Sequence, residues 1–183
     1  LRANGYFLRM TSQVPMIAPA DLDRFRADLA RLEATGRLAI AVSGGADSMA
    51  LLTLAYAALP GQIVAATVDH RLRVAAADEA AMVAAYCAAL AVPHTILTPE
   101  APIAGASIQA QAREARYALL ARWARDAGAL ALLTAHHADD QAETFLMRAV
   151  RGSGAAGLAG GRARATIAGF PVLRPLLGWR RDD

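Results

Sequence analysis

Short apolar runs alternate with longer, alanine-rich helical stretches along most of this chain, and this alternation limits the possible fold more than any other feature. The pattern predicts strands over residues 38–42, 62–68, 94–98, 129–134 and 166–173, and helices over 21–35, 47–59, 75–91, 106–127 and 137–150. Strands separated by helices of this length pair in parallel, because a parallel pair needs a long crossover. The sequence therefore predicts an α/β fold: an open, Rossmann-like parallel sheet with helices on both faces.

Polar residues follow three of these predicted strands. They occupy residues 43–48, 69–73 and 134–140. Right-handed crossovers place the carboxyl ends of parallel strands along one edge of a sheet, and ligands bind at that edge. We therefore expect the three segments to lie together and to form the functional site.

The first of these segments has the composition of a phosphate-binding loop. It comprises Ser43, Gly44, Gly45, Ala46, Asp47 and Ser48. Two glycines allow a tight turn and a close approach of the backbone to a ligand, and the first N–H groups of the next helix attract anions. A Walker A loop is excluded, because it needs a lysine and all 19 basic residues of this chain are arginines. The alternative is an ordinary glycine-rich turn between a strand and a helix.

The second segment ends the strand over 62–68. Val68 and His70 are expected beside the first loop, where the base or ribose of a nucleotide would bind, and Arg73 is a candidate for contacts with RNA. Ordinary charged loop residues are the alternative interpretation.

The third segment carries the acids of the predicted site. Asp140 and Glu143 are three residues apart and share a helix face. Together with Asp47 they predict a Mg²⁺ site, with Asp47 and Asp140 as ligands, because Mg²⁺ prefers hard oxygen donors. His136 is expected to line the site rather than to bind a metal. The alternative is that the acids only complement the dipole of their helix.

Arginines form two further groups. Arg113 and Arg116 share a face early in the helix over 106–127, where they could hold a phosphate. Seven more arginines, and no acid, occur from Arg148 to Arg181. Arg148 and Arg151 precede a glycine-rich stretch. We expect contacts of Arg116, Arg148 and Arg151 with RNA phosphates, the alternative for the whole stretch being a solvated basic tail.

The remaining composition is that of a cytoplasmic domain. The single cysteine, Cys87, lies in a predicted helix and is expected to be buried, so a disulfide framework is excluded. The apolar stretch 49–68 is interrupted at 60–62, and no membrane span is predicted. Residues 1–18 are expected to be a disordered or upstream leader, and 19–178 the catalytic domain.

Six motifs together resemble the catalytic domain of the tRNA(Ile)-lysidine synthetases, in the PP-loop (ATP pyrophosphatase) superfamily. They are SGGADS at 43–48, VDHRLR at 68–73, SIQAQAREARY at 107–117, TAHHADDQAET at 134–144, RGSGAAGL at 151–158 and RPLL at 174–177. The resemblance implies an adenine nucleotide alpha hydrolase-like fold. It also implies ATP, Mg²⁺, free L-lysine and an isoleucine tRNA with a CAU anticodon as ligands, and it leaves a homodimer open.

The reaction implied by the resemblance is adenylation of C2 of the wobble cytidine, followed by attack of lysine and release of AMP. The loop 43–48 would then hold pyrophosphate, and Asp47 and Asp140 would place Mg²⁺. Glu143 would hold or deprotonate the lysine amine, and Arg113 would steady the substrate. The family's C-terminal tRNA-recognition domains are expected to be absent from this chain. A PP-loop tRNA thiolase, an amide-forming synthetase and a non-catalytic ATP-binding module are the alternatives.

Overall fold

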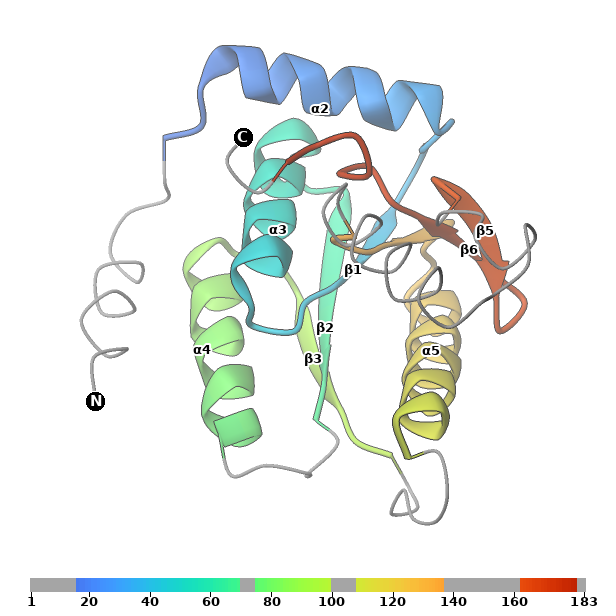
Figure 1. Cartoon of the computed structure of the whole chain (residues 1–183). Helices are drawn as coiled ribbons and strands as arrows, with labels where there is room; N and C mark the ends of the chain where they lie inside the picture. The colour runs from blue at the N-terminus through green and yellow to red at the C-terminus, as the bar shows by residue number, and fades with distance from the viewer. Residues whose placement is uncertain (1–15, 70–74, 100–107, 137–161, 181–183) are drawn as a thin grey trace.

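One six-stranded sheet organises the chain. The computed structural model describes residues 16–69, 75–99, 108–136 and 162–180. Its elements in chain order are α2 (Pro19–Arg31), β1 (Leu38–Ala41), α3 (Ala46–Ala58), β2 (Ile63–Val68), α4 (Ala75–Ala89), β3 (His94–Leu97), α5 (Ile108–Asp126), β4 (Ala131–Leu133), β5 (Arg164–Ile167) and β6 (Phe170–Leu173). The strands lie in the order β3-β2-β1-β4-β6-β5 (Figure 1).

The five strands from β3 to β6 pair in parallel, which confirms the predicted sheet. Leu38 of β1 is in register with Ile63 of β2 and with Ala131 of β4, so β1 lies at the centre of the parallel part. The order reverses at this strand, since the chain moves from β1 to β2 and β3 on one side and to β4 on the other. In such sheets, the crevice outside the carboxyl ends of the strands at the reversal binds the ligand.

The prediction of one strand over 166–173 was wrong. The segment is an antiparallel hairpin in which β5 pairs with β6 at the edge of the sheet. Its two-residue turn consists of Ala168 and Gly169, with φ of 50° and 68°. Positive φ at both positions is typical of a type I′ turn, which usually contains asparagine or glycine at the first position. The turn could not be predicted from the sequence, because alanine at position 168 is not a typical turn residue.

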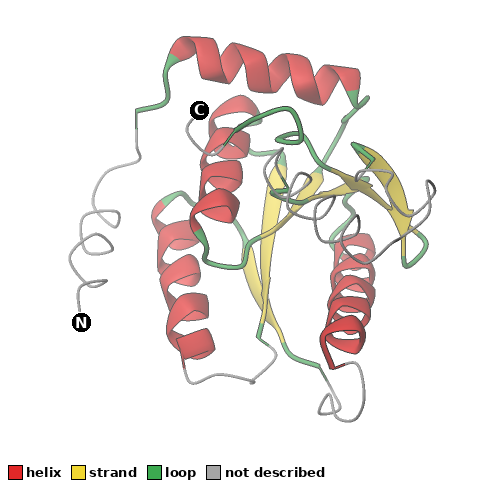
Figure 2. Cartoon of the chain, in the orientation of Figure 1, coloured by secondary structure: helices red, strands yellow, loops and turns green. Residues whose placement is uncertain are grey.

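Helices cover both faces of the sheet, as predicted (Figures 1 and 2). One core cluster joins α2, α3 and α4 to one face and includes Phe25, Leu52 and Ile40. The other joins α5 to the opposite face and includes Leu120 and Leu132. Neighbouring residues of β1 and β4 point into different clusters, which explains why these strands are continuous apolar runs.

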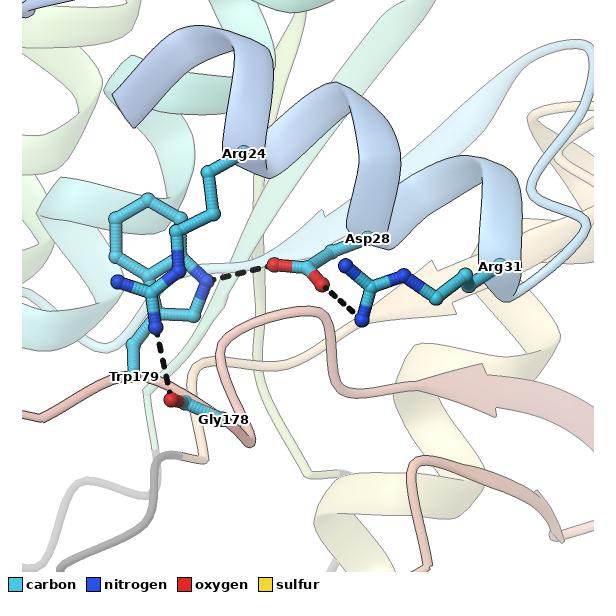
Figure 3. A network of polar contacts seen from close by, with 5 residues as sticks. All are labelled: Arg24, Asp28, Arg31, Gly178 and Trp179. Atoms are coloured by element: carbon cyan, nitrogen blue, oxygen red, sulfur yellow. Dashed lines mark hydrogen bonds and ion pairs between the residues drawn. The ribbon is translucent and has the colours of Figure 1, made fainter. Parts of the chain in front are cut away.

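The segment after β6 returns to α2 and is fastened there by polar contacts (Figure 3). The indole Nε1 of Trp179 donates a hydrogen bond to Asp28 at 2.8 Å, and Arg31 pairs with the same carboxylate at 3.2 Å. The guanidinium of Arg24 lies 4.2 Å from the centre of a Trp179 ring and donates to the carbonyl of Gly178. These contacts fix the end of the described chain against the first helix.

Two other predictions concern residues that the structure does not describe. The helix expected over 137–150 and most of the leader expected over 1–18 lie outside the described residues. Among the helices that the structure describes, none has the length and apolar character needed to cross a membrane.

Candidate active site

The loop between β1 and α3 is a sharp turn against α4. Gly44 is buried and has a φ of +86°, a conformation that side chains rarely adopt. A Cβ atom at Gly44 would lie 3.3 Å from the Cβ of Glu79 on α4. The position therefore requires glycine both for its backbone conformation and for the close approach of α4.

Hydrogen bonds centred on Ser48 hold the loop in shape. Ser48 is only 7% exposed, and its hydroxyl donates to the carbonyl of Gly45 at 2.9 Å. It accepts hydrogen bonds from the amide of Ser43 at 3.1 Å and from the Ser43 hydroxyl at 3.2 Å. Both hydroxyls and the Ser43 amide thus donate within the loop, so in this arrangement a ligand would depend on the amides after Ser43.

The start of α3 favours an anion. Gly45 is the N-cap residue, and the helix begins at Ala46. A glycine supplies no side-chain oxygen to the first amides of the helix, so a phosphate oxygen can take that place. Ser43, Gly45 and Ala46 are exposed, which makes this rim accessible. The predicted cofactor-binding residues 43–48 therefore form one loop with an exposed rim and a buried anchor.

Asp47 lies half-buried in the first turn of α3. Mg²⁺ bound with a polyphosphate commonly uses only one or two protein carboxylates, and Asp47 beside the loop fits one of these. The second predicted ligand, Asp140, lies outside the described residues. Within the described ranges there is no group of three or more metal-binding side chains, so the Mg²⁺ site stays a prediction.

The ends of β2 and β4 flank the loop, as the parallel topology predicts. Ala41 is in register with Ala66, so half-buried Val68 lies at the same edge as Ser43. On the other side, the Thr134 hydroxyl lies 3.1 Å from Nδ1 of His136 and orients the imidazole. Val68 and His136 are therefore brought to the loop. The other residues predicted for these segments, His70, Arg73, Asp140, Glu143, Arg148 and Arg151, lie outside the described residues.

Arg113 and Arg116 share one aromatic ring on α5. Their guanidinium carbons lie 5.1 Å and 5.4 Å from the centre of the Tyr117 ring, which confirms the predicted common face. Tyr117 is 3% exposed and packs in the core cluster with Ala39 and Ala66 of the central strands. Its buried hydroxyl has no hydrogen-bond partner among the described residues. Sequence reasoning missed Tyr117, because a tyrosine in a helix usually indicates only packing.

Sequence reasoning also did not single out Arg174 as a candidate site residue. The sequence grouped it with the arginines of a basic tail, but its side chain is 7% exposed at the end of β6. Arg164, in the same hairpin, is exposed and pairs with Glu33 at 2.9 Å. The alternative of a uniformly solvated tail is therefore wrong for Arg174. Its position directly after an apolar strand was the signal that could have singled it out.

Cys87 is buried, as predicted. Burial raises the pKa of its thiol to about 11, so the thiolate is scarce at neutral pH. His94 is far from the loop in sequence. It lies 3.0 Å from the Thr67 hydroxyl, and burial lowers its pKa. Neither residue provides a reactive group at the carboxyl edge of the sheet.

The chain is similar in sequence to several curated enzymes. The tRNA(Ile)-lysidine synthase of Novosphingobium aromaticivorans is 50% identical over 163 residues, which cover 87% of this chain and 50% of that protein. The enzyme of the same name from Zymomonas mobilis is 53% identical over 153 residues, covering 81% of this chain and 46% of that protein. The chain thus spans about half the length of the curated relatives it matches.

Solved structures of other enzymes share the fold. A U34-tRNA thiolase from Methanococcus maripaludis matches 97% of this chain and 61% of its own, with a TM-score of 0.71 and 17% identity. An NH3-dependent NAD synthetase from Campylobacter jejuni matches 96% of this chain and 69% of its own, with a TM-score of 0.54 and 16% identity. At these identities the likeness concerns the fold alone.

A family model described as a PP-loop domain matches residues 19–183. The chain belongs to the PP-loop domain family.

Proposed function

We propose that this chain carries the ATP-activating site of a tRNA(Ile)-lysidine synthase. The observation that carries the proposal is the 50% identity over 163 residues to an enzyme of that name. The exposed loop 43–48 at the start of α3 supports it, because the start of a helix attracts anions. The proposed substrates are ATP, free L-lysine and an isoleucine tRNA whose anticodon is CAU. The product is lysidine, with AMP and pyrophosphate released.

The reaction proceeds in two steps. The O2 atom of the wobble cytidine attacks the α-phosphorus of ATP, and pyrophosphate leaves with the electrons of the broken P–O bond. The lysine amine then attacks C2 and loses a proton, and AMP leaves with the former O2. The modified base carries a nitrogen substituent at C2 in place of oxygen.

The loop 43–48 acts in the first step. Its amides and the start of α3 bind the β- and γ-phosphates and stabilise the negative charge that grows on pyrophosphate as it leaves. Val68 and His70 border the base or ribose, and His136 lines the opposite side of the loop. Asp47 and Asp140 would hold Mg²⁺, which would supply positive charge to neutralise the phosphates.

The second step depends on residues of α5 and of the segment after β4. Glu143 holds or deprotonates the lysine amine, and Arg113 steadies the substrate or the adenylate. Arg73, Arg116, Arg148 and Arg151 contact phosphates of the tRNA. Stacking of Arg113 and Arg116 on Tyr117 supports this proposal, because it holds both guanidinium groups on one face of α5.

A thiolase built on the same fold is less well supported. Sulfur transfer by a cysteine needs an accessible thiolate, and Cys87, the only cysteine in this chain, is buried with a raised pKa. The structural likeness to a thiolase is at 17% identity and concerns the fold.

The test is transfer of labelled lysine to an isoleucine tRNA transcript in the presence of ATP and Mg²⁺. We expect transfer to the CAU transcript and none to a transcript with another wobble base. Arg113→Ala and Glu143→Ala should abolish transfer, whereas Arg122→Ala, in the second half of α5, should not. Release of AMP with tRNA that does not depend on lysine, or full activity of both variants, would contradict the proposal.

A further inference from the structure

Arg174 carries a buried charge that is only partly satisfied by the residues the structure describes. Its guanidinium donates through Nη1 to the carbonyl of Arg162, and its backbone amide donates to Ala163 at 2.8 Å. The side chain is 7% exposed. Among the described residues, no carboxylate lies within ion-pair distance of it.

A guanidinium can make more hydrogen bonds than this one. The group has five N–H donors and stays charged at every physiological pH. Buried arginines are therefore usually paired with a carboxylate or with an anionic ligand. Within the described ranges one carbonyl oxygen satisfies a small part of this capacity, and the remaining N–H donors could bind an anion.

The topology places Arg174 at the edge that carries the phosphate loop. Leu173 of β6 is in register with Leu133 of β4, which is in register with Ile40 of β1. Arg174 therefore follows β6 at the level where Thr134 follows β4, and the amide of Thr134 donates to the Leu173 carbonyl at 3.0 Å. Two strand spacings, about 10 Å, separate β6 from β1. The Arg174 guanidinium bonds the carbonyl of Arg162 on the β5 side of β6, so contact with a ligand phosphate requires the side chain to turn toward β4.

His136 follows the intervening strand. That strand, β4, separates β1 from β6, and Thr134 holds the Nδ1 atom of His136. Three groups therefore follow three neighbouring strands. The loop amides follow β1, the imidazole of His136 follows β4, and the buried guanidinium of Arg174 follows β6. All three are groups that can donate hydrogen bonds to an anion.

We propose that Arg174 is an anion-binding residue that contacts a phosphate group of the ligand bound at the crevice between β1 and β4. The phosphate belongs either to the nucleotide or to the RNA backbone, and the experiment separates these two sources. The inference rests on the proposed function for the identity of the ligand. It adds a binding residue to the far side of the site, on a strand that the phosphate loop does not reach.

The test compares Arg174→Met, which keeps the length of the side chain and removes its charge, with Arg164→Met as the matched control in the same hairpin. Pyrophosphate, ATP and tRNA transcript are titrated separately by calorimetry. For Arg174→Met we expect about tenfold or greater loss of affinity for the ligand that supplies the phosphate, and for Arg164→Met no more than about twofold. If Arg174→Met loses affinity for pyrophosphate and ATP, the phosphate belongs to the nucleotide. If it loses affinity for tRNA alone, the phosphate belongs to the RNA backbone.

Thermal unfolding without ligand is the second readout. Removing an incompletely paired buried charge should leave the melting temperature of Arg174→Met close to that of the wild type. If this variant fails to fold, Arg174→Lys decides: weaker binding with an unchanged circular dichroism spectrum supports the inference, and unchanged binding overturns it.

Affinities of Arg174→Met within about twofold of the wild type for all three ligands would overturn the inference. So would a wild-type chain that binds none of them. Arg174-dependent binding without lysine transfer would instead contradict the proposed function and leave the inference standing.

Discussion

The hydroxyl of Ser48 lies 3.1 Å from the backbone nitrogen of Ser43 and closes the loop between β1 and α3 from within the first turn of the helix. Ser48 is buried and Ser43 is exposed. A buried anchor therefore holds the exposed rim in a fixed conformation. The shape of the loop 43–48 depends on contacts that the chain makes with itself.

Replacing Ser48 with alanine should open this loop. Ser48→Ala removes three hydrogen bonds and leaves the amide of Ser43 without its acceptor, whereas the carbonyl of Gly45 keeps the amide of Met49 as a donor. We expect the free energy of unfolding to fall by about 1–3 kcal/mol and the affinity for pyrophosphate to fall with it. Urea unfolding and calorimetric titration measure the two effects. Ser43→Ala is the control, because it loses only the hydroxyl contact at the exposed rim, and equal effects of the two variants would contradict this account.

Gly44→Ala should be more harmful than the same change at Gly61. Both glycines have positive φ, +86° and +73°, so each substitution carries a backbone penalty of about 1–2 kcal/mol. The new methyl group at Gly44 would also press on Glu79, whereas at Gly61 nothing lies within 4 Å. We expect Gly44→Ala to lower the melting temperature more than Gly61→Ala does. Only Gly44→Ala should also lose nucleotide binding. Equal melting temperatures and equal binding would show that the approach of α4 does not matter.

Two buried tyrosines should respond in opposite ways to loss of their hydroxyl groups. Tyr86 shares a hydrogen bond of 2.9 Å with Thr53, so Tyr86→Phe should cost about 1 kcal/mol of stability. The Tyr117 hydroxyl has no partner among the described residues, so Tyr117→Phe should leave stability unchanged or raise it. Because the ring under Arg113 and Arg116 is kept, lysine transfer should survive in Tyr117→Phe and fall in Tyr117→Leu. Denaturant midpoints and transfer rates check both points, and destabilisation by Tyr117→Phe would reveal a bonded hydroxyl.

Cys87 should make stability depend on pH in the alkaline range. Burial raises the pKa of its thiol from the ordinary value of 9.0 to about 11. The folded state therefore keeps a proton that the unfolded state loses, so the contribution is complete below pH 9 and declines as pH rises toward 11. The chain has no lysine, which leaves few other groups to titrate there. The difference in unfolding free energy between wild type and Cys87→Ala should shrink over this range, and a constant difference would contradict the assignment.

Much of the fold was predictable because the central strands are apolar on both sides. The strands expected over 38–42 and 62–68 are β1 (Leu38–Ala41) and β2 (Ile63–Val68). Pairing at the edge was harder to predict. The residues of β5 alternate between exposed and half-buried, and Ala168 gives no turn signal. The hairpin therefore depends on tertiary pairing with β6.

Part of the site was predictable for the same reason. Parallel topology alone places Ser43, Val68 and His136 at one edge. The stacking of Arg113 and Arg116 on Tyr117 and the burial of Arg174 depend on how α5 and β6 pack on the sheet. Local sequence patterns do not predict this packing. The roles of Asp140, Glu143 and the arginines near them stay predictions.

The products of ATP cleavage test most directly whether the loop 43–48 holds a departing pyrophosphate. ATP labelled at the α-phosphate is incubated with the chain, Mg²⁺, lysine and the CAU transcript, with the Zymomonas mobilis synthase as a positive control. We predict labelled AMP that appears only when both tRNA and lysine are present and that is lost in Gly44→Ala. Labelled ADP, or AMP formed equally without tRNA, would contradict the account.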